Sequence, residues 1–105
     1  MFSAAIANRR KNEGRYEDAC EVYGELIRLF PDDSTFYKER GNILFLLGHF
    51  EEALGAIDEA IYLQPENAQL YVSKGRVLAR QKKFIEALFD YQRAVTLGTS
   101  DFPGS

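Results

Sequence analysis

The chain has 105 residues, of which 46% are hydrophobic and 28% charged, and its net charge at pH 7 is −3. This composition is typical of one small folded domain, and the small net charge gives no general attraction to nucleic acid or membrane surfaces. One cysteine and one histidine exclude an internal disulfide and a four-ligand Cys/His zinc site, so we predict no cofactor or metal.

In chain order, hydrophobic periodicity and capping residues predict helices in pairs, and no strands. Ser34 is the expected N-cap of the third helix and Gly48 its stop, while Asn67 is the expected N-cap of the fifth helix. The expected ranges are Phe2–Asn12, Tyr16–Leu29, Thr35–Leu47, Glu51–Leu63 and, as a further pair, Ala68–Leu97.

The helix pairs belong to an internal repeat with a step of about 34 residues. The same step separates residues of like type at several positions. Examples are Ala19, Ala53 and Ala87; Tyr16, Phe50 and Phe84; and Leu29, Leu63 and Leu97. We therefore predict one domain over residues 1–105 with repeats at about 1–33, 34–67 and 68–101.

Small and aromatic residues recur where two helices of one pair should meet. Gly41 and Gly75 are expected where the two helices cross closely, and Ala53 and Ala87 opposite them. Aromatic residues should fill the space around each crossing. Tyr37 and Tyr71 are expected beside it, and Tyr16, Phe50 and Phe84 should staple the second helix onto the first. A single pair cannot bury its apolar face, so the pairs must stack.

With these positions the sequence resembles the tetratricopeptide repeat family, over residues 1 to about 98. The middle repeat matches the family pattern with Tyr37, Gly41, Leu44, Gly48, Phe50, Ala53, Ile57, Ala60 and Pro65. Arg40 and Lys74 depart from it, standing where the family usually has leucine, and Lys82 replaces a turn glycine. The resemblance implies an all-α, right-handed α-solenoid of three helix-turn-helix repeats, six antiparallel helices in all.

We find no catalytic constellation, so the chain is not expected to be an enzyme. His49 is expected in a solvated turn, and Cys20 as a small core residue rather than a reactive thiol. The neighbouring acidic residues do not form a carboxylate dyad, because adjacent residues on a helix point in different directions. No apolar run approaches the roughly 20 residues that span a bilayer, and we expect a cytoplasmic location.

The resemblance implies that a peptide or protein segment binds in the concave groove lined by the first helix of each repeat. Asparagine can donate to and accept from a peptide backbone, and lysine and arginine can pair with ligand carboxylates. The predicted binding residues are Asn8, Lys11, Lys38, Asn42, Phe45, Leu46, Val72, Arg76 and Arg80; Ala4, Asn12 and Ala79 share the same register.

Two more specific partners are disfavoured. Family members that bind acidic chaperone C-terminal tails use a two-carboxylate clamp, and this chain has Ala4, Asn8, Glu39, Gln69 and Ser73 at the clamp positions. Only Asn8 matches, so the clamp is not expected. RNA binding, known for related helical repeats, is the alternative function. The acidic total and a shortage of stacking aromatics beside Arg76 and Arg80 argue against nucleic acid.

The end of the array is expected to expose an apolar stripe on the last helix, formed by Ile85, Leu88 and Val95. The C-terminal tail, a second molecule or the next part of a longer protein could cover it, and we predict self-association. Repeats one and two are net acidic and the remainder net basic, which also permits head-to-tail contacts. The chain as a fragment or accessory domain of a larger protein is the remaining alternative.

Overall fold

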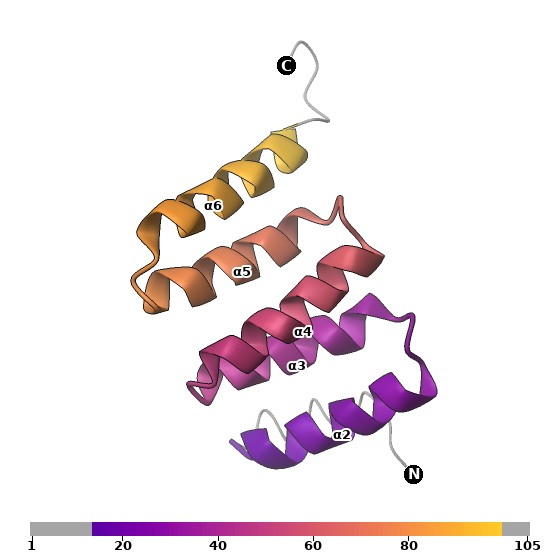
Figure 1. Cartoon of the computed structure of the whole chain (residues 1–105). Helices are drawn as coiled ribbons and strands as arrows, with labels where there is room; N and C mark the ends of the chain where they lie inside the picture. Colours follow the sequence, from indigo (N-terminus) through magenta and orange to yellow (C-terminus); the bar gives the residue numbers. More distant parts are fainter. Residues whose placement is uncertain (1–13, 100–105) are drawn as a thin grey trace.

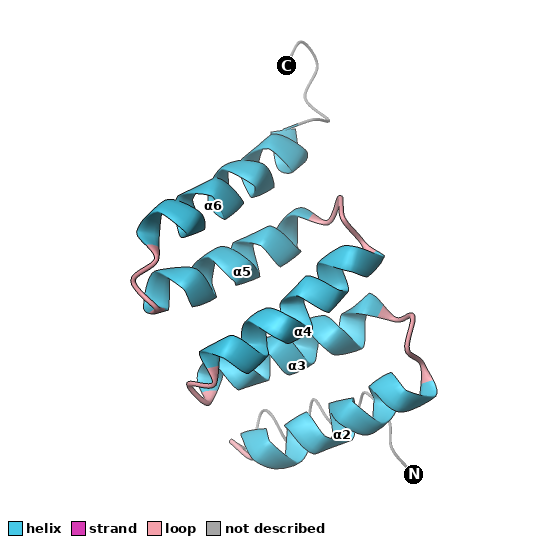
Figure 2. Ribbon diagram, in the orientation of Figure 1, coloured by secondary structure: helices cyan, strands magenta, loops and turns pink. Residues whose placement is uncertain are grey.

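The computed structural model describes residues 14–99, and Figure 1 shows that these residues form a stack of helices. No strand occurs in this part of the chain (Figure 2), so the predicted all-α helical-repeat fold is confirmed. The helix predicted over Phe2–Asn12 lies outside the described residues. The five helices are α2 (Tyr16–Leu29), α3 (Ser34–Leu46), α4 (Phe50–Leu63), α5 (Ala68–Arg80) and α6 (Phe84–Thr99).

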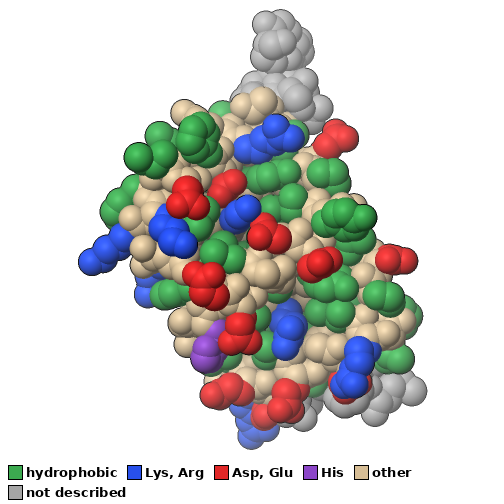
Figure 3. Space-filling view, in the orientation of Figure 1, with side chains coloured by type: hydrophobic (Ala, Val, Ile, Leu, Met, Phe, Trp, Pro, Cys, Tyr) green, Lys and Arg blue, Asp and Glu red, His purple; other side chains and the backbone are tan. Residues whose placement is uncertain are grey.

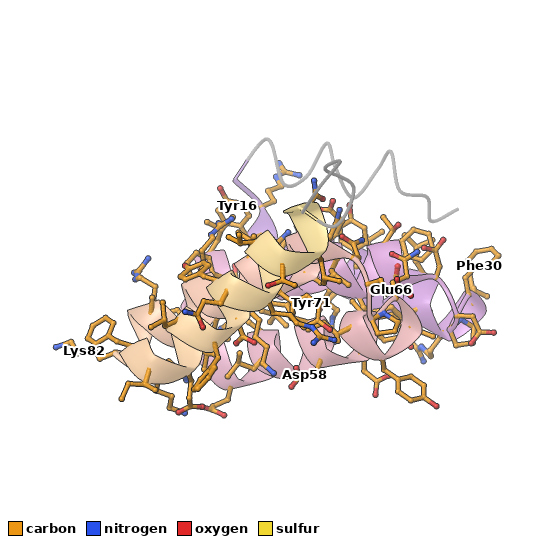
Figure 4. All side chains as sticks on the ribbon, turned by 90° about the horizontal axis from the view of Figure 1, so that it is seen from above. Tyr16, Phe30, Asp58, Glu66, Tyr71 and Lys82 are labelled. Carbon is orange, nitrogen blue, oxygen red and sulfur yellow. The ribbon has the colours of Figure 1, made fainter. Side chains whose placement is uncertain are left out.

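Each helix packs antiparallel to the next, and the connections fall at two opposite ends of the stack. The turn containing Lys82 lies at one end, whereas Phe30 and Glu66, which belong to the loops between repeats, lie at the other (Figure 4). In the orientation of Figure 1, α4 lies in front of α3. The stack thus has one face made by α3 and α5 and another made by α2, α4 and α6.

The close crossing predicted at Gly41 is confirmed, whereas Gly75 lies against an aromatic side chain of the next helix. A Cβ atom added to Gly41 would lie 2.7 Å from Ile57 Cγ1 and 3.3 Å from the Ala53 carbonyl oxygen. A Cβ atom on Gly75 would lie 2.8 Å from Tyr91 Cε1. At Gly41 a side chain would collide with Ile57 and crowd the backbone of α4, so glycine allows α3 and α4 to approach as they do. At Gly75 the atoms that an added side chain would meet belong to the Tyr91 ring of α6.

The core is continuous from the first repeat into the third. Its largest fully buried side chains include Tyr23 of α2, Ile43 of α3, Ile57 of α4 and Val77 of α5. Cys20 is buried beside them, as the sequence indicates. Burial on this scale is the main stabilising contribution, because hydrophobic free energy rises with the apolar area removed from water.

The caps confirm one prediction and correct another. Asn67 caps α5, its Oδ1 accepting a hydrogen bond from the Gln69 N–H at 3.1 Å. Ser34 does not cap α3: it is the first helical residue and is buried, and Asp33 Oδ1 accepts from the Thr35 N–H at 3.0 Å. The carboxylate one position earlier has the geometry of an Asx turn, so the helix begins one residue before Thr35.

The aromatic positions of the repeat make contacts that the sequence did not indicate, and one of them, Phe84, departs from its predicted role. The Tyr37 hydroxyl donates to the Pro31 carbonyl at 3.0 Å, and the Tyr71 hydroxyl donates to the Pro65 carbonyl at 2.8 Å. Each tyrosine therefore ties a helix to the loop that precedes it. Phe84 does not staple α6, because 64% of its surface is exposed. The turn before it places Lys82 at a φ of 64°, where the family has glycine.

Candidate functional site

Two arginines and one phenylalanine form a cluster where α5 passes α3. The Arg76 guanidinium carbon lies 5.3 Å from the centre of the Phe45 ring, and that of Arg80 lies 5.5 Å from it. Arg80 also lies 5.8 Å from the Phe50 ring centre at the start of α4. Because both guanidinium groups rest on aromatic faces, their positions are restrained although the side chains are solvent-exposed.

The aromatic floor beneath the arginines was missed in the sequence. Phe45 and Phe50 pack at a centroid distance of 5.9 Å, with their planes tilted by 52°. The expectation that aromatic residues are scarce beside Arg76 and Arg80 is therefore wrong. The signal was present in the sequence, since Phe45 was placed on the groove face by register, but its contact with the arginines depends on how α5 packs across α3.

The cluster presents positive charge, and no carboxylate among the described residues pairs with it. Within residues 14–99 neither Arg76 nor Arg80 makes an ion pair with a carboxylate. Glu51 lies at the start of α4 but is engaged elsewhere, because its Oε2 accepts from Gln81 Nε2 at 2.7 Å and lies 4.0 Å from Lys83 Nζ. Among the described residues, the two neighbouring guanidinium groups therefore have aromatic rather than acidic partners.

The other predicted groove residues are less closely associated. Lys38 and Asn42 are half-buried on α3, one turn apart. Leu46 and Val72 leave 53% and 38% of their surfaces in solvent. Asn8 and Lys11 lie outside the described residues. The structure therefore brings together Phe45, Arg76 and Arg80, whose guanidinium groups lie over the Phe45 ring.

The positions of the two-carboxylate clamp have different surroundings. Glu39 is half-buried on α3, Gln69 is exposed on α5, and Ser73 is buried. Burial raises the pKa of the Tyr23 phenol to about 12, with the Glu39 charge as the second cause. The charge of Glu39 therefore influences Tyr23 of α2. Glu39 lies on α3, the helix that also carries Lys38 and Asn42.

The residues that could suggest chemistry lie within residues 14–99. His49 is exposed in the turn before α4, with Nδ1 3.8 Å from Glu52 Oε1. Across residues 14–99, His, Cys, Asp and Glu side chains form no cluster that could hold a metal ion. None of the described helices is long and apolar enough to cross a membrane.

Comparison with known protein families shows to which family the chain belongs. The family model described as tetratricopeptide repeat matches residues 4–67 and residues 44–102, which together cover nearly the whole chain. The chain belongs to the tetratricopeptide repeat family. A tetratricopeptide repeat fold implies a protein–protein interaction module, and the family is generally non-catalytic.

Solved tetratricopeptide repeat structures resemble the chain closely in fold. The second such domain of Spaghetti (RPAP3), bound to the HSP90 peptide SRMEEVD, has a TM-score of 0.84 and 24% identity, covering 89% of this chain and 86% of that one. The TPR2B domain of yeast Sti1, in its pHsp70 complex, has a TM-score of 0.86 and 25% identity, covering 94% of this chain and 79% of that one.

A third relative comes from a different biological setting. The type III secretion translocator chaperone SycD of Yersinia enterocolitica, crystallised in an alternative dimer, has a TM-score of 0.88 and 22% identity, covering 94% of this chain and 74% of that one. No curated protein matches the chain by sequence. The structural likenesses therefore define the fold, whereas the partner has to be argued from this chain's own residues.

Proposed function

We propose that this domain binds an acidic segment of a partner protein on the face formed by α3 and α5, the concave groove of its family. The observation that supports the proposal most directly is the cluster of Arg76 and Arg80 on Phe45. A carboxylate of the ligand would pair with one or both guanidinium groups, and Lys38 and Asn42 would contact the segment further along α3.

The cluster suits this role for a physical reason. Guanidinium groups held on an aromatic ring lose less conformational entropy when they bind, and their planar donors match a carboxylate in bidentate fashion. Two cations close together repel each other, and an anion between them relieves that repulsion. Leu46 and Val72 add exposed apolar surface on the same two helices.

Similar domains that bind a partner support the proposed way of binding, in which the domain holds a segment of another protein. They do not indicate which protein supplies that segment. Spaghetti is described with an HSP90 peptide and Sti1 in a pHsp70 complex. This chain has Glu39, Gln69 and Ser73 at clamp positions, so a chaperone tail held by that clamp stays excluded as a prediction. A different acidic segment, anchored at Arg76 and Arg80, is the partner we propose, for a scaffold working in the cytoplasm.

The proposal predicts charge-selective peptide binding that depends on two residues. We expect a fluorescently labelled peptide of glutamate and alanine to bind, and the Arg76→Ala/Arg80→Ala variant to bind at least about tenfold more weakly. Fluorescence anisotropy at two salt concentrations measures both effects. Arg15→Ala/Arg28→Ala removes the same charge from exposed positions at the two ends of α2 and should retain most of the affinity. Equal losses in both variants would contradict the proposed site.

RNA binding remains the alternative. Phe45 and Phe50 have faces covered by guanidinium groups, so they are poorly placed to stack on bases. A single-stranded RNA oligonucleotide run in the same titration separates the two functions. Binding of RNA, with none of the acidic peptide, would replace the proposed function.

Self-association is a second property that the last helix favours. Ile85, Leu88 and Val95 leave 75%, 55% and 63% of their surfaces exposed on α6, and Phe89 is exposed beside them. We expect the protein to form dimers at high concentration in light scattering, and Leu88→Glu to shift it toward the monomer. A strict monomer at all concentrations would refute this prediction.

A further inference from the structure

A groove lies on the opposite face of the molecule, between α2 and α4. Both helices pack against α3, and the groove between them has a volume of about 880 Å³. Small residues line its walls: Gly24 on α2, and Gly55 and Ala56 on α4. A Cβ atom added to Gly55 would meet no atom within 4 Å, so the groove is open at that point.

The chain has two comparable junctions between helix pairs: the first, where α2 packs on α3, and the second, where α4 packs on α5. We call them the first and second joints, and comparing their side chains shows why the groove forms at the first. Asp58 occupies the position in the second repeat that Gly24 occupies in the first. Lys74 is in the same way equivalent to Arg40. At that second joint Lys74 Nζ lies 3.0 Å from Asp58 Oδ1, so the two side chains meet between the repeats. Desolvation lowers the Lys74 pKa, but the hydrogen bond and charge of Asp58 and the charge of Asp90 outweigh it and raise the pKa.

The first joint lacks this side-chain pair. Gly24 offers no carboxylate, and the half-buried Arg40 donates from Nε to the Cys20 carbonyl at 3.4 Å. Arg40 also packs close to Gly24, at 3.8 Å from where a Cβ atom would be. Space that the second joint fills with Asp58 is thus left open in the first, with Arg40 at the base of the groove.

The groove is acidic overall. Five carboxylates line it against two cations, Arg28 and Arg40. Arg28 is paired with Glu25, while Glu21 and Glu59 make no ion pair with any residue of the described chain. Figure 3 shows acidic side chains spread over the face on which α4 lies in front. The five carboxylates are Asp18, Glu21, Glu25, Glu52 and Glu59.

We propose that this groove is a second docking surface, which takes a lysine- or arginine-bearing segment of a partner protein. The small side chains of Gly24, Gly55 and Ala56 let a peptide lie close to the two helices. Glu21 on one wall and Glu59 on the other pair with its cations. The sign of charge is opposite to that of the Arg76 and Arg80 cluster, so the domain can hold an acidic and a basic segment on different faces.

The test uses a labelled oligo-arginine peptide as probe and two kinds of variant. Glu21→Gln/Glu59→Gln should weaken binding about tenfold, since it removes two exposed charge pairs. Gly55→Trp should weaken it at least as much without changing any charge, because the indole fills the groove. Circular dichroism and urea unfolding establish that each variant is folded.

The matched control is Glu66→Gln/Glu86→Gln, which removes the same charge from exposed positions outside the groove. It should leave the affinity within about twofold of the wild type. Unchanged affinity of Gly55→Trp, or an equal loss in the control, would show that the peptide follows overall charge and would overturn the groove. If adding the peptide dissociated dimers of the protein, the groove would be the contact between two copies of the chain. That result would overturn the proposal that a partner protein binds there.

Discussion

Replacing Gly41 with alanine is expected to lower the free energy of unfolding by about 2 kcal/mol, although alanine is the better helix former. The new methyl group would lie 2.7 Å from Ile57 Cγ1, and Ile57 is fully buried. Neither Ile57 nor the Ala53 carbonyl, 3.3 Å away, can move without disturbing the core. The helices α3 and α4 would have to separate, which exposes the seam of the middle repeat.

The same substitution at Gly55 provides the matched control. Gly55 lies in the interior of α4, is exposed, and has nothing within 4 Å of an added Cβ atom. Alanine there should raise the free energy of unfolding by about 1 kcal/mol, because it lowers the entropy of the unfolded chain. Urea denaturation of both variants measures the pair. Stabilisation by Gly41→Ala would refute the close crossing on which the repeat depends.

The second large effect is expected at high pH and involves Tyr23. Burial, and secondarily the charge of Glu39, raises the pKa of its phenol from 10.0 to about 12. A group whose folded pKa is raised stabilises the fold below its unfolded pKa, and that contribution is lost as the pH rises through the folded pKa. The free energy of unfolding should therefore fall between pH 10 and 12, by about 2 to 3 kcal/mol in total from this residue.

Tyr23→Phe tests this directly. The variant loses the ionisable hydroxyl, so its free energy of unfolding should change less across the same pH range. Because the ring stays in the core, it should remain folded at pH 7. Urea unfolding at several alkaline pH values measures the slope, and Tyr62→Phe, at an exposed tyrosine, is the control. Parallel slopes for Tyr23→Phe and the wild type would contradict the raised pKa.

Much of the fold could be predicted because the same residue types recur in the sequence at a step of about 34 residues. A single Gly-x-x-Leu is a weak signal, but Gly41 and Gly75 at the same place in two repeats indicated a helix crossing, and the structure confirms it at Gly41. The range of α2 matches the prediction, and α3 and α4 each begin one residue earlier than expected. The cap of α3 was misplaced because Asp33 and Ser34 are both good capping residues and only geometry distinguishes them.

The candidate site was predicted in part. Register placed Phe45, Arg76 and Arg80 on the same face, since that depends only on position within a helix. Their contact, and the participation of Phe50, depends on the angle at which α5 packs across α3, which no local pattern encodes. The groove between α2 and α4 was missed for the same reason. The sequence does contain a clue, because Gly24 stands where the next repeat has Asp58. That difference predicts a groove only once the structure shows Arg40 packed beside Gly24.

The most direct measurement of the central claim is a map of amide chemical shifts by NMR as the acidic peptide is added to the labelled protein. Binding at the proposed site predicts the largest shifts in α3 and α5 around Phe45, Arg76 and Arg80, saturating with the same affinity as the anisotropy titration. It also predicts small shifts along α2. Shifts centred on α2 and α4, or shifts that are uniform and never saturate, would contradict an acidic-peptide site on the α3 and α5 face.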